Sequence, residues 1–281
     1  MTTDEKLAAI LAAVQTDPGN RGLARDPHDN LFTATAGQFQ AACRSIAEHP
    51  SPRVRIYTGF FIPTAEPPAF ETDGPLGALV LRAIFRELEI PLQVCGEYPV
   101  VRVAGSGDRV ETPTHLIALE RPGPTADGSF RTMRGRDITQ YHQAVHAEYE
   151  VDARRASYSI GIGDGGNEIG MGKISPEVIA SNVYNGTEVH CRVATDYLIV
   201  AGVSNWGAYA LAAGVALLRG KAVEIVKLLL PDADLPVLRV MVKYGPLVDG
   251  VTGRQEATVD GLPWDVYAAP LLRIREILEL P

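Results

Sequence analysis

The sequence predicts an α/β protein with three layers, in which a mostly parallel, Rossmann-like sheet carries helices on both faces. Two observations lead to this prediction. Short apolar segments of strand length alternate along the chain with longer segments of helical periodicity, which is typical of a parallel sheet. Unusual polar motifs recur just after a strand and just before a helix, and parallel sheets bind their ligands at that edge. The chain has 281 residues and 46% hydrophobic content, which is ample for a large core.

In the first half of the chain, turn residues and prolines mark where the elements begin and end. The residues Asp17-Pro-Gly-Asn20 end an N-terminal helix, and Pro50 follows a second helix. Pro75 suits the first turn of a third helix, because its fixed φ angle matches a helical backbone. We expect helices over residues 6–14, 36–48 and 76–88, and strands over residues 53–57, 92–95 and 115–119.

The second half of the chain continues the alternation. Ser175 and Pro176 open a helix as its N-cap and its first residue. We expect further helices over residues 138–149, 206–218, 222–230, 237–244 and 266–278, strands over 157–162 and 197–200, and a loop over 250–261. Because there is no linker, internal repeat or low-complexity segment, residues 1–281 are expected to form a single domain.

Composition and charge exclude several classes of function. The net charge is −8 and no run of lysine or arginine alternates with aromatic residues, so no nucleic-acid partner is expected. The longest apolar stretch, residues 208–218, is too short for a bilayer, which needs about 20 residues, so no membrane partner is expected. The N-terminus lacks the features of a signal or transit peptide, which predicts a cytoplasmic protein. The cysteines lie far apart and are expected to be buried free thiols.

The densest motif is a glycine-rich run at residues 161–172, in which six of twelve positions are glycine. Such density is expected where the backbone must turn sharply or approach a ligand closely. The run carries Asp164, Asn167 and Glu168, and two acids beside an amide predict a pocket for a cation, an amine or a metal. The run also contains a G-x-G-x-x-G pattern, but Asp164 would then face a pyrophosphate group, so no nucleotide cofactor is expected.

Polar motifs from separate loops are predicted to meet at the carboxyl edge of the sheet, beside the helix N-termini. They are Thr58-Gly59, Glu71-Thr-Asp73, Glu120-Arg121 and the segments 163–168 and 202–206. We expect Asp73, Asp164 and Glu168 to be the catalytic acids. Clustered carboxylates bind Mg²⁺, Mn²⁺ or an ammonium group, and they raise one another's pKa so that one serves as a general base. The same three residues are therefore the candidate metal ligands.

Other candidates would contact a ligand rather than react with it. Ser204 has no nucleophile elbow around it, so Ser204, Asn205 and Trp206 are expected to orient a ligand. In this interpretation Asn205 is an amide donor and Trp206 is a wall of the pocket. Arg254 lies in a second polar loop, residues 249–261, where it either clamps a carboxylate or belongs to an ordinary surface turn.

Two histidines, His142 and His146, are four residues apart in a predicted helix, with Glu150 one turn further. Zinc proteases use this histidine spacing, but with a glutamate directly after the first histidine, where this chain has Gln143. An exposed helix face is the interpretation that the sequence favours.

Several long motifs follow one another in a specific order between Thr58 and Pro263. They are Glu71-Thr-Asp-Gly-Pro75, Leu119-Glu-Arg-Pro-Gly123 with Ala126-Asp-Gly128, Gly163-Asp-Gly-Gly-Asn-Glu-Ile-Gly-Met-Gly-Lys173, Ala201-Gly-Val-Ser-Asn-Trp-Gly207, and Asp249-Gly-Val-Thr-Gly-Arg254 with Thr258-Val-Asp-Gly-Leu-Pro263. Together they resemble the C-terminal domain of the D-glutamate cyclase family. Full-length members of that family also carry a large N-terminal domain of another type, which this sequence does not contain.

The resemblance implies a carbon–oxygen hydro-lyase that converts D-glutamate to 5-oxo-D-proline and water. On this hypothesis Asp164 and Glu168 act as base or metal ligands and Asp73 is the second carboxylate. Backbone N–H groups of the loop at Gly165 and Gly166, a helix N-terminus or a metal would stabilise the charge that develops on the carbonyl oxygen. The residues expected to orient the substrate are Asn167, Asn205 and, at its α-carboxylate, Arg254.

The alternative function is a non-catalytic or partner-dependent module. Such a module would keep the pocket and bind an acidic amino acid or a divalent metal. It would need a separately encoded partner for catalysis. For the chain in either interpretation, the macromolecular partner expected is a second copy in a homo-oligomer or a separately encoded N-terminal domain.

Overall fold

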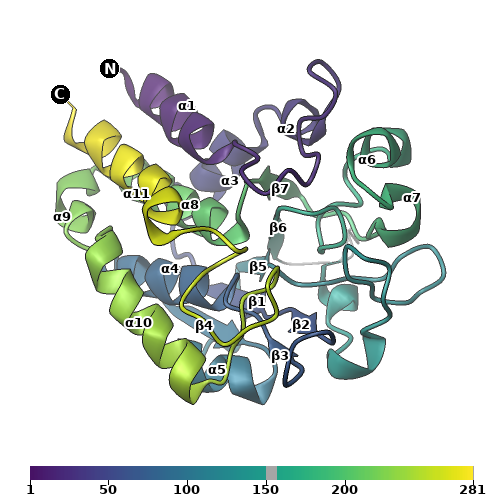
Figure 1. Cartoon of the computed structure of the whole chain (residues 1–281). Coiled ribbons are helices and arrows are strands. Elements are labelled where there is room, and N and C mark those ends of the chain that lie inside the picture. The colour runs from purple at the N-terminus through teal and green to yellow at the C-terminus, as the bar shows by residue number, and fades with distance from the viewer. Residues whose placement is uncertain (150–156, 281) are drawn as a thin grey trace.

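The computed structural model describes residues 1–149 and 157–280. Within this part of the chain, a five-stranded parallel sheet lies at the centre of the molecule, in the order β4-β1-β5-β6-β7 (Figure 1). The strands are β1 (Val54–Thr58), β4 (Leu92–Cys95), β5 (His115–Leu119), β6 (Tyr158–Gly163) and β7 (Tyr197–Val200). Helices surround this sheet, so the predicted three-layer α/β fold is confirmed.

The helices agree with the predicted ones at most positions. They are α1 (Thr3–Val14), α2 (Leu31–Ala34), α3 (Gln38–Ala47), α4 (Pro75–Glu87), α5 (Tyr98–Ala104), α6 (Pro176–Asn182), α7 (Gly186–Val189), α8 (Ser204–Leu218), α9 (Ala222–Val226), α10 (Pro231–Tyr244) and α11 (Trp264–Glu279). A hairpin of β2 (Phe61–Ile62) and β3 (Ala69–Phe70) precedes α4. Across the described residues, every helix is too short or too polar to traverse a lipid bilayer.

Short elements account for most of the differences from prediction. Helices α2, α5 and α7 and the β2–β3 hairpin were not predicted, because each is too short to show a periodic apolar pattern. The helix predicted over residues 222–230 ends at Val226, and α10 begins at Pro231 rather than at residue 237. Pro236 lies inside α10, in a region where the sequence favours a helix boundary.

The two faces of the sheet carry separate cores. Alternate strand residues such as Ile56, Ile117 and Ile160 belong to the core on the first face, which contains α4 and α8. Helices α1, α3 and α11 pack against α8 on the same side (Figure 1). The neighbouring residues Leu116 and Leu198 belong to the core on the second face, which contains α6 and several loops. Burial on both faces is expected for a parallel sheet between two layers.

The helix predicted over residues 138–149 is wrong. This segment forms two 3-10 turns, Thr139–Tyr141 and His146–Glu148, joined by irregular backbone. Its apolar residues pack in different places, because Ile138 belongs to a small cluster beside the hairpin whereas Val145 belongs to the core on the second face. One straight helix would not place Ile138 and Val145 in these two separate clusters, so the helical spacing of the apolar residues does not indicate a helix here.

Glycines on β6 allow the chain to fold back over its own strand. A Cβ atom at Gly161 would lie 2.6 Å from the carbonyl oxygen of Ile169, and one at Gly163 would lie 2.9 Å from the carboxyl carbon of Glu168. Both positions require glycine because the loop that follows β6 returns against the strand. Close packing of the chain on itself therefore accounts for the first part of the glycine-rich run.

The strand order creates a switch point at the carboxyl edge of the sheet. From β1 the chain passes to β4 on one side and then to β5 on the other side, so β1 and β5 are neighbours. Phe60, after β1, and Glu120, after β5, both line a cavity at this edge. Open α/β sheets bind their ligands in this position.

Asp234 makes the stability of this fold depend on pH. It lies buried in the first turn of α10, and its Oδ2 atom has no hydrogen-bond partner among the described residues. Burial raises the pKa of Asp234 to about 7, so the folded protein holds this proton more tightly than the unfolded chain does. The free energy of unfolding therefore falls as the pH rises from about 4 through about 7.

We expect Asp234→Asn to raise the free energy of unfolding at pH 8 by about 1 to 3 kcal/mol, because each unit of pKa difference is worth about 1.4 kcal/mol. The gain should be small near pH 4, where the wild-type carboxyl group is neutral in the folded state and only partly ionised in the unfolded chain. Urea unfolding at the two pH values measures it. Asp232→Asn, at an exposed position of the same turn, is the control and should change little. A gain for Asp234→Asn that is independent of pH would contradict this account.

Candidate active site

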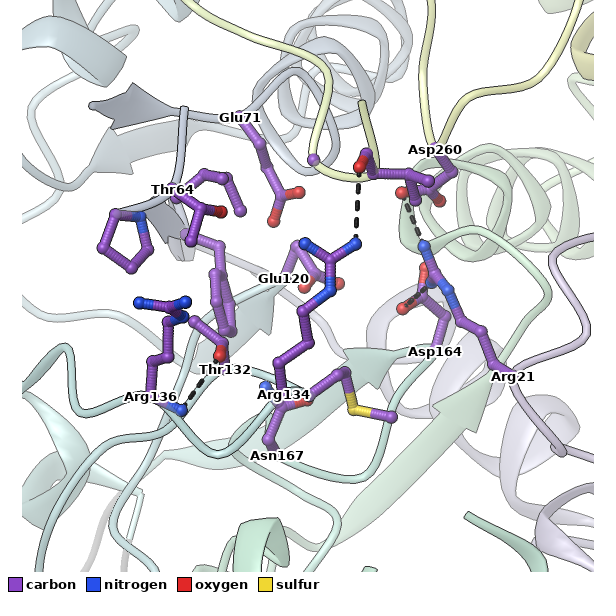
Figure 2. Close-up of a pocket in the computed structure, with 16 residues that line it drawn as sticks. Arg21, Thr64, Glu71, Glu120, Thr132, Arg134, Arg136, Asp164, Asn167 and Asp260 are labelled. Carbon is purple, nitrogen blue, oxygen red and sulfur yellow. Dashed lines mark hydrogen bonds and ion pairs between the residues drawn. The ribbon is translucent and has the colours of Figure 1, made fainter. Parts of the chain in front are cut away.

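A cavity of about 120 Å³ opens at the carboxyl edge of the sheet (Figure 2). Its charged lining residues are four acids, Glu71, Glu120, Asp164 and Asp260, and three arginines, Arg21, Arg134 and Arg136. The other lining residues are Phe60, Ile62, Pro63, Thr64, Thr132, Met133, Asn167, Gly250 and Val251. Segments that lie far apart in the sequence therefore meet at one small cavity, and its charged groups are mostly buried.

The support for this cavity is built where α4 and α8 begin. Asp73 precedes α4, yet its carboxylate accepts hydrogen bonds from the N–H groups of Ser204 (2.9 Å) and Asn205 (2.8 Å) at the start of α8. Asn205 in turn accepts hydrogen bonds from the N–H groups of Gly74 (2.8 Å) and Gly77 (2.7 Å) at the start of α4. Each helix therefore caps the N-terminus of the other and satisfies amides that a helix leaves unpaired.

Ser204 connects three of the buried acids. Its N–H group donates to Asp73 and also to Asp164 Oδ2 at 3.0 Å, and its hydroxyl group donates to Glu120 Oε2 at 2.5 Å. The first turn of α8 thus points its partial positive charge at the acids, which stabilises negative charge there. The structure brings Asp73, Asp164, Ser204 and the start of α8 together, as the sequence predicts.

Glu168 holds the glycine turn closed. Its two carboxylate oxygens accept hydrogen bonds from the N–H groups of Asp164 (2.9 Å) and Gly166 (2.7 Å). The N–H group of Gly166, expected to stabilise an oxyanion, is therefore already engaged. Gly165 lies at the same turn, where a Cβ atom would lie 3.1 Å from Glu168 Oε1. The turn is thus a compact support for Asp164, which follows β6 directly.

Arg21 supplies a counter-charge that the sequence did not single out. Its guanidinium group forms ion pairs with Asp164 and with Asp260, the latter at 2.6 Å (Figure 2). Asp17 shapes the loop after α1 by accepting a hydrogen bond from the N–H group of Arg21 (2.9 Å). Arg21 therefore ties the N-terminal segment to the glycine turn and to the loop that precedes α11.

Asp249 shapes the loop that presents Asp260. Its buried carboxylate accepts hydrogen bonds from the N–H groups of Val251 (2.9 Å) and Gly261 (2.7 Å), near the two ends of the loop. Asp260 has a φ angle of +57°, which an Asp-Gly pair tolerates better than most sequences. One carboxylate oxygen of Asp260 is buried and lacks a hydrogen-bond partner within the described part of the chain.

Glu71 lies directly against the cavity. Its N–H group donates to the carbonyl oxygen of Phe60 (2.9 Å), and its backbone pairs with Val248 in an isolated bridge. Its carboxylate lies so close to Gly250 that a side chain at that position would collide with it. Over residues 1–149 and 157–280, no hydrogen bond or ion pair engages this carboxylate. Glu71 is therefore held at its backbone while its acid group stays available to a ligand.

Burial favours the protonated forms of these acids. Burial and the neighbouring carboxylates raise the pKa values of Glu71 and Glu120 well above the usual range. Burial also raises the pKa of Asp260 to about 7, although Arg21 opposes the rise. The pKa of Asp164 is raised by burial and is again opposed by Arg21. Asp260 is therefore present in both protonation states near neutral pH, which suits proton transfer.

Two overlapping groups of acids are arranged so that they could hold a metal ion. One ligand oxygen from each member lies within 4.8 Å of the others in the groups Asp73–Asp164–Asp260 and Glu120–Asp164–Glu168. Carboxylate oxygens of this kind suit Mg²⁺ or Mn²⁺. The predicted set of Asp73, Asp164 and Glu168 is divided between the two groups.

Two residues that are expected from the sequence to contact the ligand lie away from the cavity. Arg254 is exposed, and its guanidinium group forms an ion pair at 3.1 Å with Glu256, which lies two residues further along the same loop. Trp206 is buried in the core, where its ring N–H group donates to the carbonyl oxygen of Tyr267 (3.0 Å). The expected carboxylate clamp and the expected pocket wall are therefore not at these positions.

The histidine pair His142 and His146 does not lie on an exposed helix face. The side chain of His142 is fully buried, with Nδ1 3.5 Å from Glu97, and its ring packs against Phe60. Since Phe60 lines the cavity, His142 supports its wall. Glu150, the third member of this motif, lies outside the described residues.

Several lining residues lie outside the set of site residues that the sequence predicts. Glu71 and Glu120 lie in the motifs that follow predicted strands, so their position was the available signal. Asp260 is followed by glycine, which marks a turn but not a charge cluster. For Arg21, Arg134 and Arg136 the local sequence gives no signal, because tertiary packing alone brings them to the acids.

The sequence matches the family described as D-glutamate cyclase-like, C-terminal, over residues 10–97 and 93–275. It is also 28% identical over 331 aligned residues to a human protein named D-glutamate cyclase, mitochondrial. This match covers 97% of the chain and 52% of the human protein. The chain therefore spans about half the length of that relative.

Removal of Arg21 is expected to destabilise the protein in a pH-dependent way. Arg21→Met leaves Asp164 and Asp260 buried without a counter-charge, which typically costs about 3 to 5 kcal/mol. The loss should be smaller at pH 5 than at pH 8, because the two acids take up protons at the lower pH. Urea unfolding at both pH values measures the effect. Arg25→Met, at an exposed arginine of the same loop, is the control. A loss of equal size in both arginine variants would contradict the role assigned to Arg21.

Proposed function

The chain belongs to the D-glutamate cyclase-like C-terminal family, and from this premise we propose that it cyclises D-glutamate to 5-oxo-D-proline with loss of water. Membership in the family supports a cyclase-like enzyme in general. The substrate and the roles of individual residues are our proposals. The observation that supports the proposed substrate and residue roles is the group of buried acids with raised pKa values around one small cavity.

The proposed reaction moves protons without consuming or releasing any. D-Glutamate enters with an ammonium group and two carboxylates. Its nitrogen loses two protons and forms a bond to the carbon of the γ-carboxyl group, while one oxygen leaves that carbon and departs as water with two protons. A carboxylate that accepts a proton from nitrogen and a carboxylic acid that gives one to the departing oxygen are therefore sufficient.

Glu71 and Glu120 are the proposed proton-transfer groups. Both line the cavity, and their raised pKa values favour a carboxylic acid that can donate a proton near neutral pH. Glu120 is positioned by the hydroxyl group of Ser204, whereas the carboxylate of Glu71 is available to the substrate. Asp164 and Asp260, whose ionised forms Arg21 stabilises, attract the substrate ammonium group.

The rest of the site assists the reaction through position. Ring closure is intramolecular, so a cavity that holds the folded conformer of the substrate removes much of the entropic barrier. Phe60, Ile62 and Met133 line the same cavity and leave less room for water near the acids. Asp73 and Glu168 serve as supports in this scheme, because backbone amides occupy their oxygens.

A non-catalytic or partner-dependent module is the second candidate function. It is favoured by the observation that the chain spans 52% of its human relative, so another part of that protein is a candidate for the chemistry. The acids would then bind an acidic amino acid or a divalent metal without turnover. Incubation of the purified chain with D-glutamate, followed by chromatography for 5-oxoproline, distinguishes the two. Product formation supports the enzyme, and binding without product supports the module.

Glu71→Gln and Glu120→Gln are each expected to lower kcat for 5-oxoproline formation by about 10²- to 10⁴-fold, the usual contribution of general acid–base catalysis. KM should change less, because glutamine keeps the size of the side chain. Glu111→Gln makes the same chemical change at an exposed position and should have no effect. Activity close to that of the wild type in both cavity variants would refute the assigned roles.

We also propose that the acid cluster binds Mg²⁺ or Mn²⁺ when either ion is supplied in millimolar amounts. Binding to the native state alone should raise the midpoint of thermal unfolding, and Glu120→Gln should reduce that rise because it removes one carboxylate of a candidate group. Differential scanning fluorimetry with and without each ion measures the shift. Glu111→Gln again serves as the control. An unchanged midpoint for the wild type would exclude metal binding by the isolated chain.

A further inference from the structure

A turn between β5 and β6 closes one side of the cavity. The N–H group of Thr132 donates to the carbonyl oxygen of Arg136 (2.9 Å), and the N–H group of Gly135 donates to the carbonyl oxygen of Thr132 (2.8 Å). Asn167 of the glycine-rich run donates from its side chain to the carbonyl oxygen of Arg131 (2.8 Å). The backbone that carries the arginines of this turn is therefore fixed relative to the buried acids.

The arginines of the turn differ in their partners. Arg131 forms ion pairs with two carboxylates that do not line the cavity. Arg134 and Arg136 do line it, and neither forms an ion pair with any described residue. The guanidinium group of Arg134 makes one long contact, 3.5 Å, with the carbonyl oxygen of Val251 (Figure 2). Two cationic groups therefore border the cavity without a counter-charge.

The cavity has an acidic pole and a basic pole. Glu71, Glu120 and Asp164 line the acidic part, and Figure 2 shows Arg134 reaching toward them from the turn. A guanidinium group without a carboxylate partner binds a ligand carboxylate through two parallel hydrogen bonds. We propose that Arg134, with Arg136 beside it, binds the α-carboxylate of the substrate and so makes the site select against amines that lack an α-carboxylate. This inference rests on the proposed function, because the ammonium group of the same molecule must reach the acids.

Two small molecules separate the contributions of the poles. 4-Aminobutyrate has the amine and the γ-carboxyl group of glutamate but lacks the α-carboxylate. Glutarate has both carboxylates but lacks the amine. If Arg134 binds the α-carboxylate, D-glutamate and glutarate gain affinity from it, whereas 4-aminobutyrate does not.

The double variant Arg134→Met/Arg136→Met is expected to raise KM for D-glutamate by about 10- to 100-fold, as loss of charge-assisted hydrogen bonds would do, and to change kcat by less than about threefold. The inhibition constant of glutarate should rise by a similar factor, and that of 4-aminobutyrate should stay within about twofold. Arg254→Met is the matched control, because Arg254 is an exposed arginine on the neighbouring loop that pairs with Glu256. It should leave all three constants unchanged.

An unchanged KM and unchanged glutarate inhibition in the double variant would overturn the assignment, as would an equal loss in Arg254→Met. Isothermal titration calorimetry with glutarate measures carboxylate binding without turnover, so it distinguishes failure of the arginine assignment from failure of the proposed reaction. If the wild type binds glutarate without converting D-glutamate, and the double variant does not bind it, the carboxylate site stands and the proposed activity fails. If the wild type shows neither conversion nor glutarate binding, both fail.

Discussion

The site depends on how a large negative charge is kept inside the protein. Six buried acids lie together at the carboxyl edge of the sheet: Glu71, Asp73, Glu120, Asp164, Glu168 and Asp260. Within the described chain one arginine, Arg21, forms ion pairs with acids of this group. A buried carboxylate must be hydrogen-bonded, paired with a positive charge or protonated, because an isolated one costs several kcal/mol. Hydrogen bonding, ion pairing and protonation all occur in this group of acids. Which of the three stabilises a given acid determines what that acid can do in the site.

Acids that accept hydrogen bonds from backbone amides form the frame of the site. Asp73 accepts hydrogen bonds from the start of α8 and Glu168 accepts them from the glycine turn, so each acid fixes a neighbouring segment and keeps its remaining lone pairs for a cation. Glu71 and Asp260 differ, since each keeps a carboxylate oxygen without a hydrogen bond to the described residues. No backbone N–H group of the described residues donates to the carboxylates of Glu71 and Glu120, the proposed reacting groups, and the acids that such N–H groups engage hold them in place.

Local patterns in the sequence predicted most of the fold but less of the site. Strands β4, β5 and β7 were predicted to the residue, and Ser175 marked the start of α6, because these signals act over a few neighbouring residues. The meeting of strand ends was also predictable, since a parallel sheet fixes that edge. The partner of each acid was not, because Asp73 binds an amide 131 residues away. Arg21 and Asp260 enter from loops whose paths depend on the finished core.

The charges of the cavity also imply how substrate and product would differ in binding under the proposed reaction. D-Glutamate brings an ammonium group that the acids attract, whereas the ring nitrogen of 5-oxoproline is a neutral amide. Cyclisation therefore removes the contact with the acidic pole and leaves the α-carboxylate, which Arg134 at the exposed rim would hold. Once the positive charge of the ligand is gone, the buried acids need protons or another cation again. The acidic pole thus favours the open-chain amino acid over the lactam, and the product is left bound at the rim through which it can depart.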